Sequence, residues 1–167
     1  TKKAAGFQKV LTCIIAGVGI LLVAGSTFSG DISNIKGQMF NGKNDFKIIE
    51  NIVKVAMMTP FFFFGFDVIP QAAEEINVPL RKLGKLMLLS IVLAVSFYVL
   101  VVLAVGYVMN SEAMQNSMNT TGLVTADAMA KAFNSSNMAK VLIIGGLCGI
   151  VTSWNSFMIG GSRAIYS

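Results

Sequence analysis

The sequence contains no histidine, only two cysteines and three prolines, and charged residues make up just 13% of its 167 residues. Without histidine the chain lacks the commonest general base and metal ligand, and no nucleophile–base pair is visible. We therefore expect no enzyme, no metal site and no cofactor. Cys13 and Cys148 lie in apolar runs, where cysteine usually behaves as a small buried hydrophobe.

The low charge argues against a soluble domain, which ordinarily carries about 25% charged residues. The net charge is +5, but the basic residues are scattered and do not alternate with aromatic residues. Nucleic-acid-binding surfaces normally gather their basic residues on one face. We expect no nucleic acid partner.

Apolar residues make up 54% of the chain, and they are clustered. The stretches 10–30, 86–109 and 141–162 contain no charged residue. A helix that crosses a bilayer needs about 20 apolar residues. We predict an all-α membrane protein with one transmembrane region over residues 1–167. The four expected spans cover about residues 7–24, 51–75, 83–109 and 138–162.

Two long polar segments separate the spans. Residues 25–50 are rich in turn-forming residues, and a short helix is expected to begin at Asp45 and lead into the second span. Residues 110–137 contain Thr125–Ala130, whose pattern predicts a short capped helix.

The basic residues also indicate an orientation. They are densest in short segments beside the spans, which is typical of cytoplasmic segments. We expect residues 1–6, 76–85 and 163–167 to be cytoplasmic, and the protein to lie in the plasma (inner) membrane.

The second span contains the sequence FFFFGFDVIPQAAEE, which a lipid-facing helix would not favour. Pro60 and Pro70 each remove a helical donor, and Gly65 gives backbone freedom between them. These residues predict a discontinuous helix, with two half-helices and a hinge at Gly65–Asp67. Such a hinge frees backbone groups that can bind a small polar solute.

Two polar features lie deep in the predicted spans. Asp67 would cost at least about 2.5 kcal/mol at the bilayer centre, so either a function or a satisfied cap on the second half-helix must account for it. Trp154 lies mid-span with Thr152 and Ser153 beside it. These hydroxyl residues fit either a wet cavity or hydrogen bonding between helices.

The stretches FFFFGFDVIPQAAEEINVPLRK and TSWNSFMIGGSRAIYS make a family resemblance visible. The first resembles the sixth transmembrane segment and following loop of the amino acid–polyamine–organocation permeases, and the second resembles their eighth segment. The spacing of the four spans fits segments five to eight of that family. The chain begins without methionine and ends beside a span, so we expect an interior fragment of a longer permease.

The resemblance implies a twelve-helix protein with two inverted five-helix repeats, which works by alternating access. It also implies a substrate site beside the broken sixth helix. Phe61 matches an aromatic gate above the substrate, and Phe64, Gly65 and Phe66 match the unwound stretch that meets the substrate amine. Trp154 matches a substrate-lining position.

The resemblance also bears on coupling. Asp67 matches a position tied to gating or proton coupling in some members, and Thr152 and Ser153 match a possible ion site of sodium-coupled relatives. Some proton-coupled members carry a lysine in the fifth helix. Our alignment places Ile15 or a neighbour there and Lys9 too early, so that feature does not carry over. Family membership favours proton coupling or substrate exchange over sodium coupling.

The function expected from these features is secondary active transport of an amino acid or related amine. The partners are that small molecule and the lipid bilayer, and the sequence sets no oligomeric state. The alternative is a non-transporting nutrient sensor with the same fold. A channel would favour rings of repeated polar residues, which are not seen.

Overall fold

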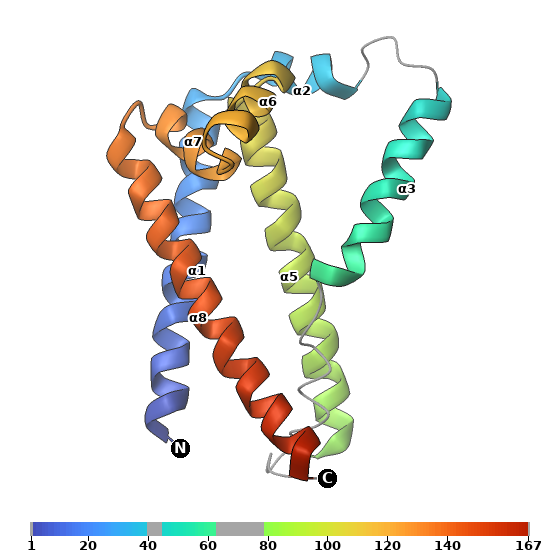
Figure 1. The fold of residues 1–167 in the computed structure, drawn as a ribbon, viewed down its shortest axis with the longest axis vertical. Helices are drawn as coiled ribbons and strands as arrows, with labels where there is room; N and C mark the ends of the chain where they lie inside the picture. The colour runs from blue at the N-terminus through green and yellow to red at the C-terminus, as the bar shows by residue number, and fades with distance from the viewer. Residues whose placement is uncertain (1, 40–44, 63–78, 167) are drawn as a thin grey trace. The chain divides into compact units, whose positions relative to one another are not determined.

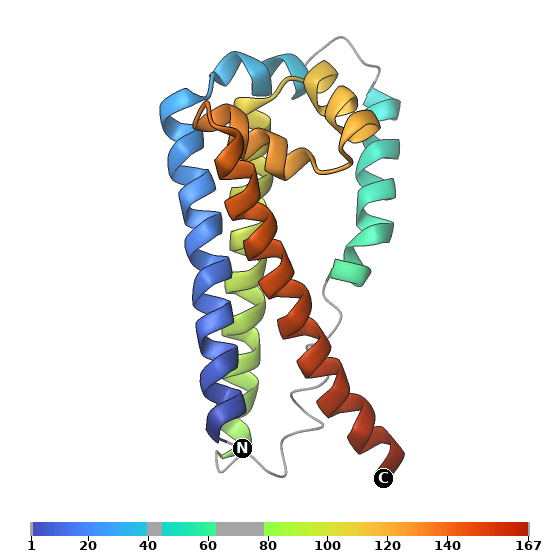
Figure 2. The same cartoon turned by 60° about the vertical axis from the view of Figure 1, so that its left-hand side comes forward.

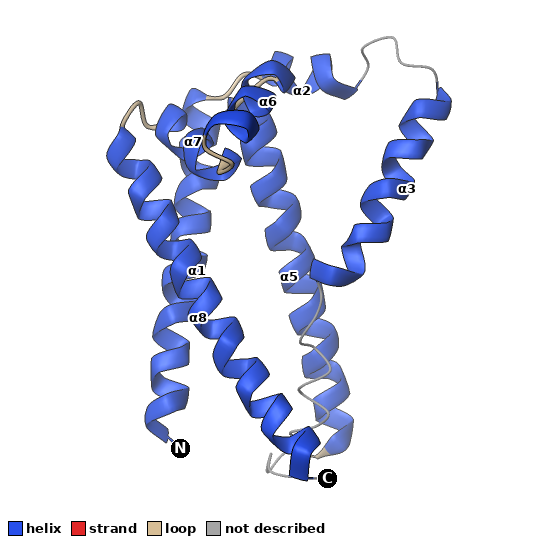
Figure 3. Cartoon of the chain, in the orientation of Figure 1, coloured by secondary structure: helices blue, strands red, loops and turns tan. Residues whose placement is uncertain are grey.

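A computed structural model describes residues 2–39, 45–62 and 79–166. These ranges are almost wholly helical and hold no strand (Figure 3), which confirms the predicted all-helical fold. The helices are α1 (Lys2–Ser29), α2 (Ile32–Met39), α3 (Asp45–Phe62), α5 (Leu80–Val108), α6 (Ser111–Thr120), α7 (Val124–Ala132) and α8 (Ser136–Tyr166). The chain divides into two compact units, Thr1–Asn41 with Val95–Thr152 and Gly42–Ala94 with Ser153–Ser167.

Three of the described helices are long and apolar enough to cross a membrane, at Gly6–Ser29, Lys82–Val108 and Ser136–Ser162. The first extends further than the predicted end near residue 24. Ser26 Oγ donates to Val23 O and Thr27 Oγ1 to Ala24 O, both at 2.7 Å. Because these hydroxyls bond to their own helix, residues that resembled a turn continue the span.

The second expected span, at about residues 51–75, is described only in part. α3 begins at Asp45, where the sequence predicted a helix to begin, and it ends at Phe62. The rest of that span and the predicted hinge at Gly65–Asp67 lie outside the described residues. The discontinuous helix and the twelve-helix arrangement therefore stay predictions.

Both polar segments contain a helix that the sequence did not predict. α2 begins after Asp31, whose Oδ1 accepts from Ser33 N at 2.9 Å. α6 begins after Asn110, whose side chain accepts from Ala113 N at 2.9 Å. Both side chains satisfy donors that a helix start leaves free.

The predicted helix at Thr125–Ala130 exists as α7, but its predicted cap is wrong. The N-cap position is Leu123, which makes no side-chain capping bond. Asp127, in the first turn, is instead directed to α6, as described below.

Two left-handed residues make the turns around α7. Gly122 has φ 68°, and its N–H donates to Ser117 O at 2.9 Å, closing the end of α6. Asn134 has φ 48° and lies between α7 and α8. Glycine adopts this region without a side-chain clash, and asparagine tolerates it better than most residues.

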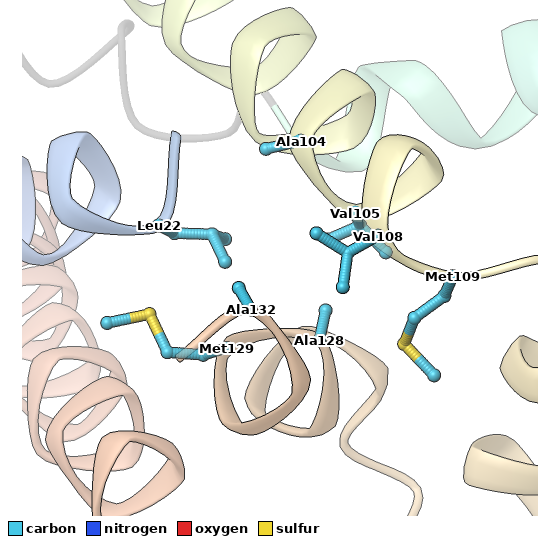
Figure 4. Close-up of a cluster of buried hydrophobic side chains, with 8 residues drawn as sticks. All are labelled: Leu22, Ala104, Val105, Val108, Met109, Ala128, Met129 and Ala132. Carbon is cyan, nitrogen blue, oxygen red and sulfur yellow. The ribbon is translucent and has the colours of Figure 1, made fainter. Parts of the chain in front are cut away.

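The buried core of the first unit lies where α7 meets α1 and the second half of α5 (Figure 4). Leu22 of α1 points toward Ala132 of α7 and Val108 of α5 toward Ala128, and Met129 is fully buried in the same cluster. Ser29 Oγ also donates to Ala132 O at 2.5 Å. These contacts hold α7 against the C-terminal end of α1 (Figure 1).

Glycines let α1 pack closely against α5 and α8, the two long helices that lie beside it in Figure 2. A methyl group at Gly145 of α8 would lie 3.1 Å from Val18 Cγ2, and one at Gly19 of α1 would overlap the Phe97 ring of α5. Only a residue without Cβ lets these helices approach so closely.

Candidate functional site

The end of α3 leads into the predicted substrate-binding stretch. Pro60 lies inside this helix and has no N–H to donate to the carbonyl one turn earlier. Thr59 Oγ1 donates to Val55 O at 2.9 Å. Phe61, the predicted gate, lies in the last turn of α3. The helix thus loses one backbone hydrogen bond directly before the predicted hinge.

Four of the predicted site residues, Phe64, Gly65, Phe66 and Asp67, lie outside the described residues. Their roles in binding the substrate amine and in gating or coupling therefore stay predictions.

The other three predicted residues are consecutive on α8, in the middle of its apolar span. Thr152 is half-buried, and its Oγ1 donates to Cys148 O at 2.7 Å. Ser153 is exposed, and Trp154 is 70% exposed. Consecutive helical residues point about 100° apart, so these three side chains cannot all face one small cavity.

A different polar set shares one side of α8. Thr152, Asn155 and Ser156 are all half-buried and follow the spacing i, i+3, i+4, which places them on one helix face. Ser153 and Trp154 lie between them and are exposed. The helical spacing was available in the sequence and favours Asn155 and Ser156 over Ser153 as companions of Thr152.

The chemistry that this face of α8 can supply depends on its hydroxyl and amide side chains. The Thr152 hydroxyl group donates its hydrogen within its own helix, to Cys148 O. Within the part of the chain that the structure describes, no three Cys, Asp or Glu side chains come together in a group that could hold a metal ion.

A second polar cluster lies outside the spans, between α6 and α7. Asp127 Oδ2 accepts from Ser117 Oγ and Thr121 Oγ1, both at 2.5 Å. These hydrogen bonds, first that of Ser117 and then that of Thr121, hold the pKa of Asp127 below its ordinary value. The cluster ties α6 to α7 and is part of the scaffold.

The comparisons with known proteins agree with this architecture. A family model described as amino acid permease matches residues 3–167, nearly the whole chain. No curated protein and no solved structure gives a significant match. The match confirms the resemblance drawn from the two sequence stretches. The chain therefore belongs to the amino acid permease family, and it is an integral membrane protein of a class that transports amino acids or amines.

Proposed function

We propose that the chain is the part of a secondary active transporter that carries an amino acid or related amine by alternating access around a broken helix at Gly65. The observation that carries this proposal is the permease family match over residues 3–167. Three long apolar helices and the proline in the last turn of α3 support it. Broken helices near the midplane are a common way for transporters to present backbone groups to a solute.

In this proposal the substrate lies between the broken helix and α8. Backbone groups of Phe64, Gly65 and Phe66 bind its amine, and Phe61 closes over it. Trp154 supplies an aromatic wall, which suits its place amid the apolar span of α8. A tryptophan so exposed and so far from both membrane boundaries is unusual, because interfacial sites are its ordinary position.

For energy coupling we propose proton transfer at Asp67 or substrate exchange in preference to a sodium gradient. Thr152 offers a single hydroxyl oxygen already engaged as a donor, and Ser153 is exposed beside it. Sodium sites need several oxygen ligands together, and these two residues lie on different sides of the helix. We place the protein in the plasma (inner) membrane with residues 1–6, 76–85 and 163–167 in the cytoplasm.

Uptake by the full-length protein in proteoliposomes tests the proposal. A panel of labelled amino acids and amines is offered under an inward proton gradient, under an inward sodium gradient, and with substrate preloaded inside. We expect accumulation with the proton gradient or the preload, and no gain with sodium. Failure of every compound under every condition would contradict transport and favour a nutrient sensor.

A further inference from the structure

The corner between α1 and α2 is held firmly against the end of α5. A methyl group at Gly30 would overlap the Tyr107 ring, so the two segments touch at the corner itself. Asp31 N and Asn34 Nδ2 both donate to Tyr107 O at 3.0 Å. The Tyr107 carbonyl therefore accepts two hydrogen bonds, and these fix the start of α2 to the last turn of α5.

These contacts give the corner an inner and an outer face. Asn34 and Ile35 are half-buried, and Ile35 Cγ1 lies 3.8 Å from where a methyl group at Gly106 would be. Two large apolar side chains of the corner are exposed, Phe28 to 90% and Ile32 to 55%, and we refer to them as its outer face. The corner therefore presents two large apolar side chains that nothing in the described structure covers.

The two spans set the depth of this outer face. Gly6–Ser29 ends one residue after Phe28, and Lys82–Val108 ends one residue after Tyr107. Because the two ends are in contact, they lie at one level, the edge of the apolar layer. Aromatic side chains are favoured at that level, and lysine stems lie along apolar surface while the amine reaches the polar groups.

Lys36 supplies a charge beside the apolar pair. It is exposed, follows Ile32 by one helical turn, and makes no ion pair with any carboxylate among the described residues. The neighbouring carboxylate of Asp31 is bound to Ser33, whose backbone N–H and then side chain lower its pKa. Asp31 thus serves as the helix cap and leaves the amine of Lys36 to an external anion.

We propose that Phe28, Ile32 and Lys36 form a phospholipid-binding surface, which we name the interfacial corner. Phe28 and Ile32 insert at the boundary between acyl chains and headgroups, and Lys36 binds lipid phosphate. Bilayer phospholipid is the partner that offers apolar chains below and a phosphate above at this depth. Another helix of the permease or a second copy would cover the same face without contact to lipid.

Spin-label accessibility in the full-length protein tests this surface. Single cysteines replace Phe28, Ile32 or Lys36 in a background without other cysteines, in nanodiscs of phosphatidylcholine and phosphatidylglycerol. Two reference sites bracket the depth: Val102, which is exposed within the α5 span, and Glu112, which is exposed on α6. Nitroxide collisions are measured with oxygen, which partitions into lipid, and with a water-soluble nickel chelate.

We expect labels at positions 28 and 32 to show a several-fold higher oxygen-to-nickel ratio than position 112. Position 36 should fall between the ratios at 28 and 112, at the level of the phosphates. Protection of positions 28 and 32 from both reagents would overturn the proposal in favour of a protein partner. A ratio at position 28 equal to that at position 112 would overturn it by placing the corner in water. Neither outcome depends on transport activity.

Discussion

Hydroxyl side chains within the spans of this chain bond to carbonyls of their own helix. Thr12 Oγ1 donates to Gln8 O and Ser90 Oγ to Leu86 O, both at 2.9 Å, as Thr152 does to Cys148. The bilayer core has no water to satisfy a free hydroxyl, so this local bond lowers the cost of placing it there. A polar residue in such a span is therefore not by itself a sign of a binding site.

Asp127 allows a pH prediction at the residue scale. Its folded pKa lies below the ordinary 3.8, so its stabilising effect is fully present above that value and is lost as the pH falls through the lowered pKa. Asp127→Asn should cost roughly 1 kcal/mol of unfolding free energy at neutral pH, since its hydrogen bonds are partly exposed to solvent. Thermal unfolding of the purified protein from pH 7 to pH 3 measures the effect.

The difference between parent and Asp127→Asn should shrink toward the acid end of that series. Glu112→Gln removes the same charge from the exposed first turn of α6 and serves as the control. A stability loss in Asp127→Asn that grows as the pH falls would contradict the assignment.

Asp67 carries a second prediction at this scale. If its carboxyl group takes part in proton coupling, Asp67→Asn should lose gradient-driven uptake while retaining exchange of preloaded substrate, because exchange needs no net proton movement. Uptake and exchange are measured in proteoliposomes across pH 5 to pH 8. Unchanged gradient-driven uptake at every pH would remove the coupling role.

The polar run around Trp154 on α8 is visible in the sequence, which leaves open whether Thr152 and Ser153 face a cavity or form hydrogen bonds between helices. The structure shows that Thr152 is half-buried and Ser153 exposed. Consecutive positions in a sequence say nothing about a shared face unless the helical period is applied.

At the scale of helices, long apolar runs predicted the positions of α1, α5 and α8, although α1 extends past the predicted end of its apolar segment. Apolar length is a property of the segment alone, so the sequence determines it. α2 and α6 were missed because their residues resemble turns. α2 is held by contacts to Tyr107 O, far away in the sequence, which composition does not reveal.

The α1–α8 contact gives a prediction with a matched control in the neighbouring residue. Gly145→Leu should force α1 and α8 apart, because a methyl group alone would already lie 3.1 Å from Val18. Overpacking of this kind costs about 1–3 kcal/mol. Gly146→Leu adds the same side chain where no atom lies within 4 Å.

Melting temperatures of the two glycine variants in detergent measure this difference. The Gly145 variant should melt below the parent, and the Gly146 variant should melt close to it. Equal melting temperatures for the two variants would show that the close approach of α1 and α8 is not needed.

The packing of α7 gives a second prediction at this scale. Met129 is fully buried against α1 and α5, so Met129→Ala should leave a cavity and cost about 2–4 kcal/mol. Met118→Ala on α6 makes the same truncation at a side chain that is 66% exposed and should cost little. Limited proteolysis of the α6–α7 segment reports the loosening, and equal cleavage of both variants would contradict the packing.

At the scale of the whole molecule, the apolar helices and the family match give different information. Three apolar helices establish only that the chain can cross a membrane. The permease match over residues 3–167 adds the transport class. The identity of the substrate depends on groups that a single sequence pattern does not specify.

We propose that transport requires an open backbone at Gly65. Counterflow of a labelled substrate in proteoliposomes tests it, with Gly65→Val compared with Gly84→Val, an exposed α5 glycine that has no atom near its Cβ position. We predict that Gly65→Val lowers the initial rate by about tenfold, which corresponds to ~1.4 kcal/mol in the barrier. Gly84→Val should leave the rate close to that of the parent. A rate in Gly65→Val equal to that in Gly84→Val, at matched protein density, would show that transport does not need an open backbone at Gly65.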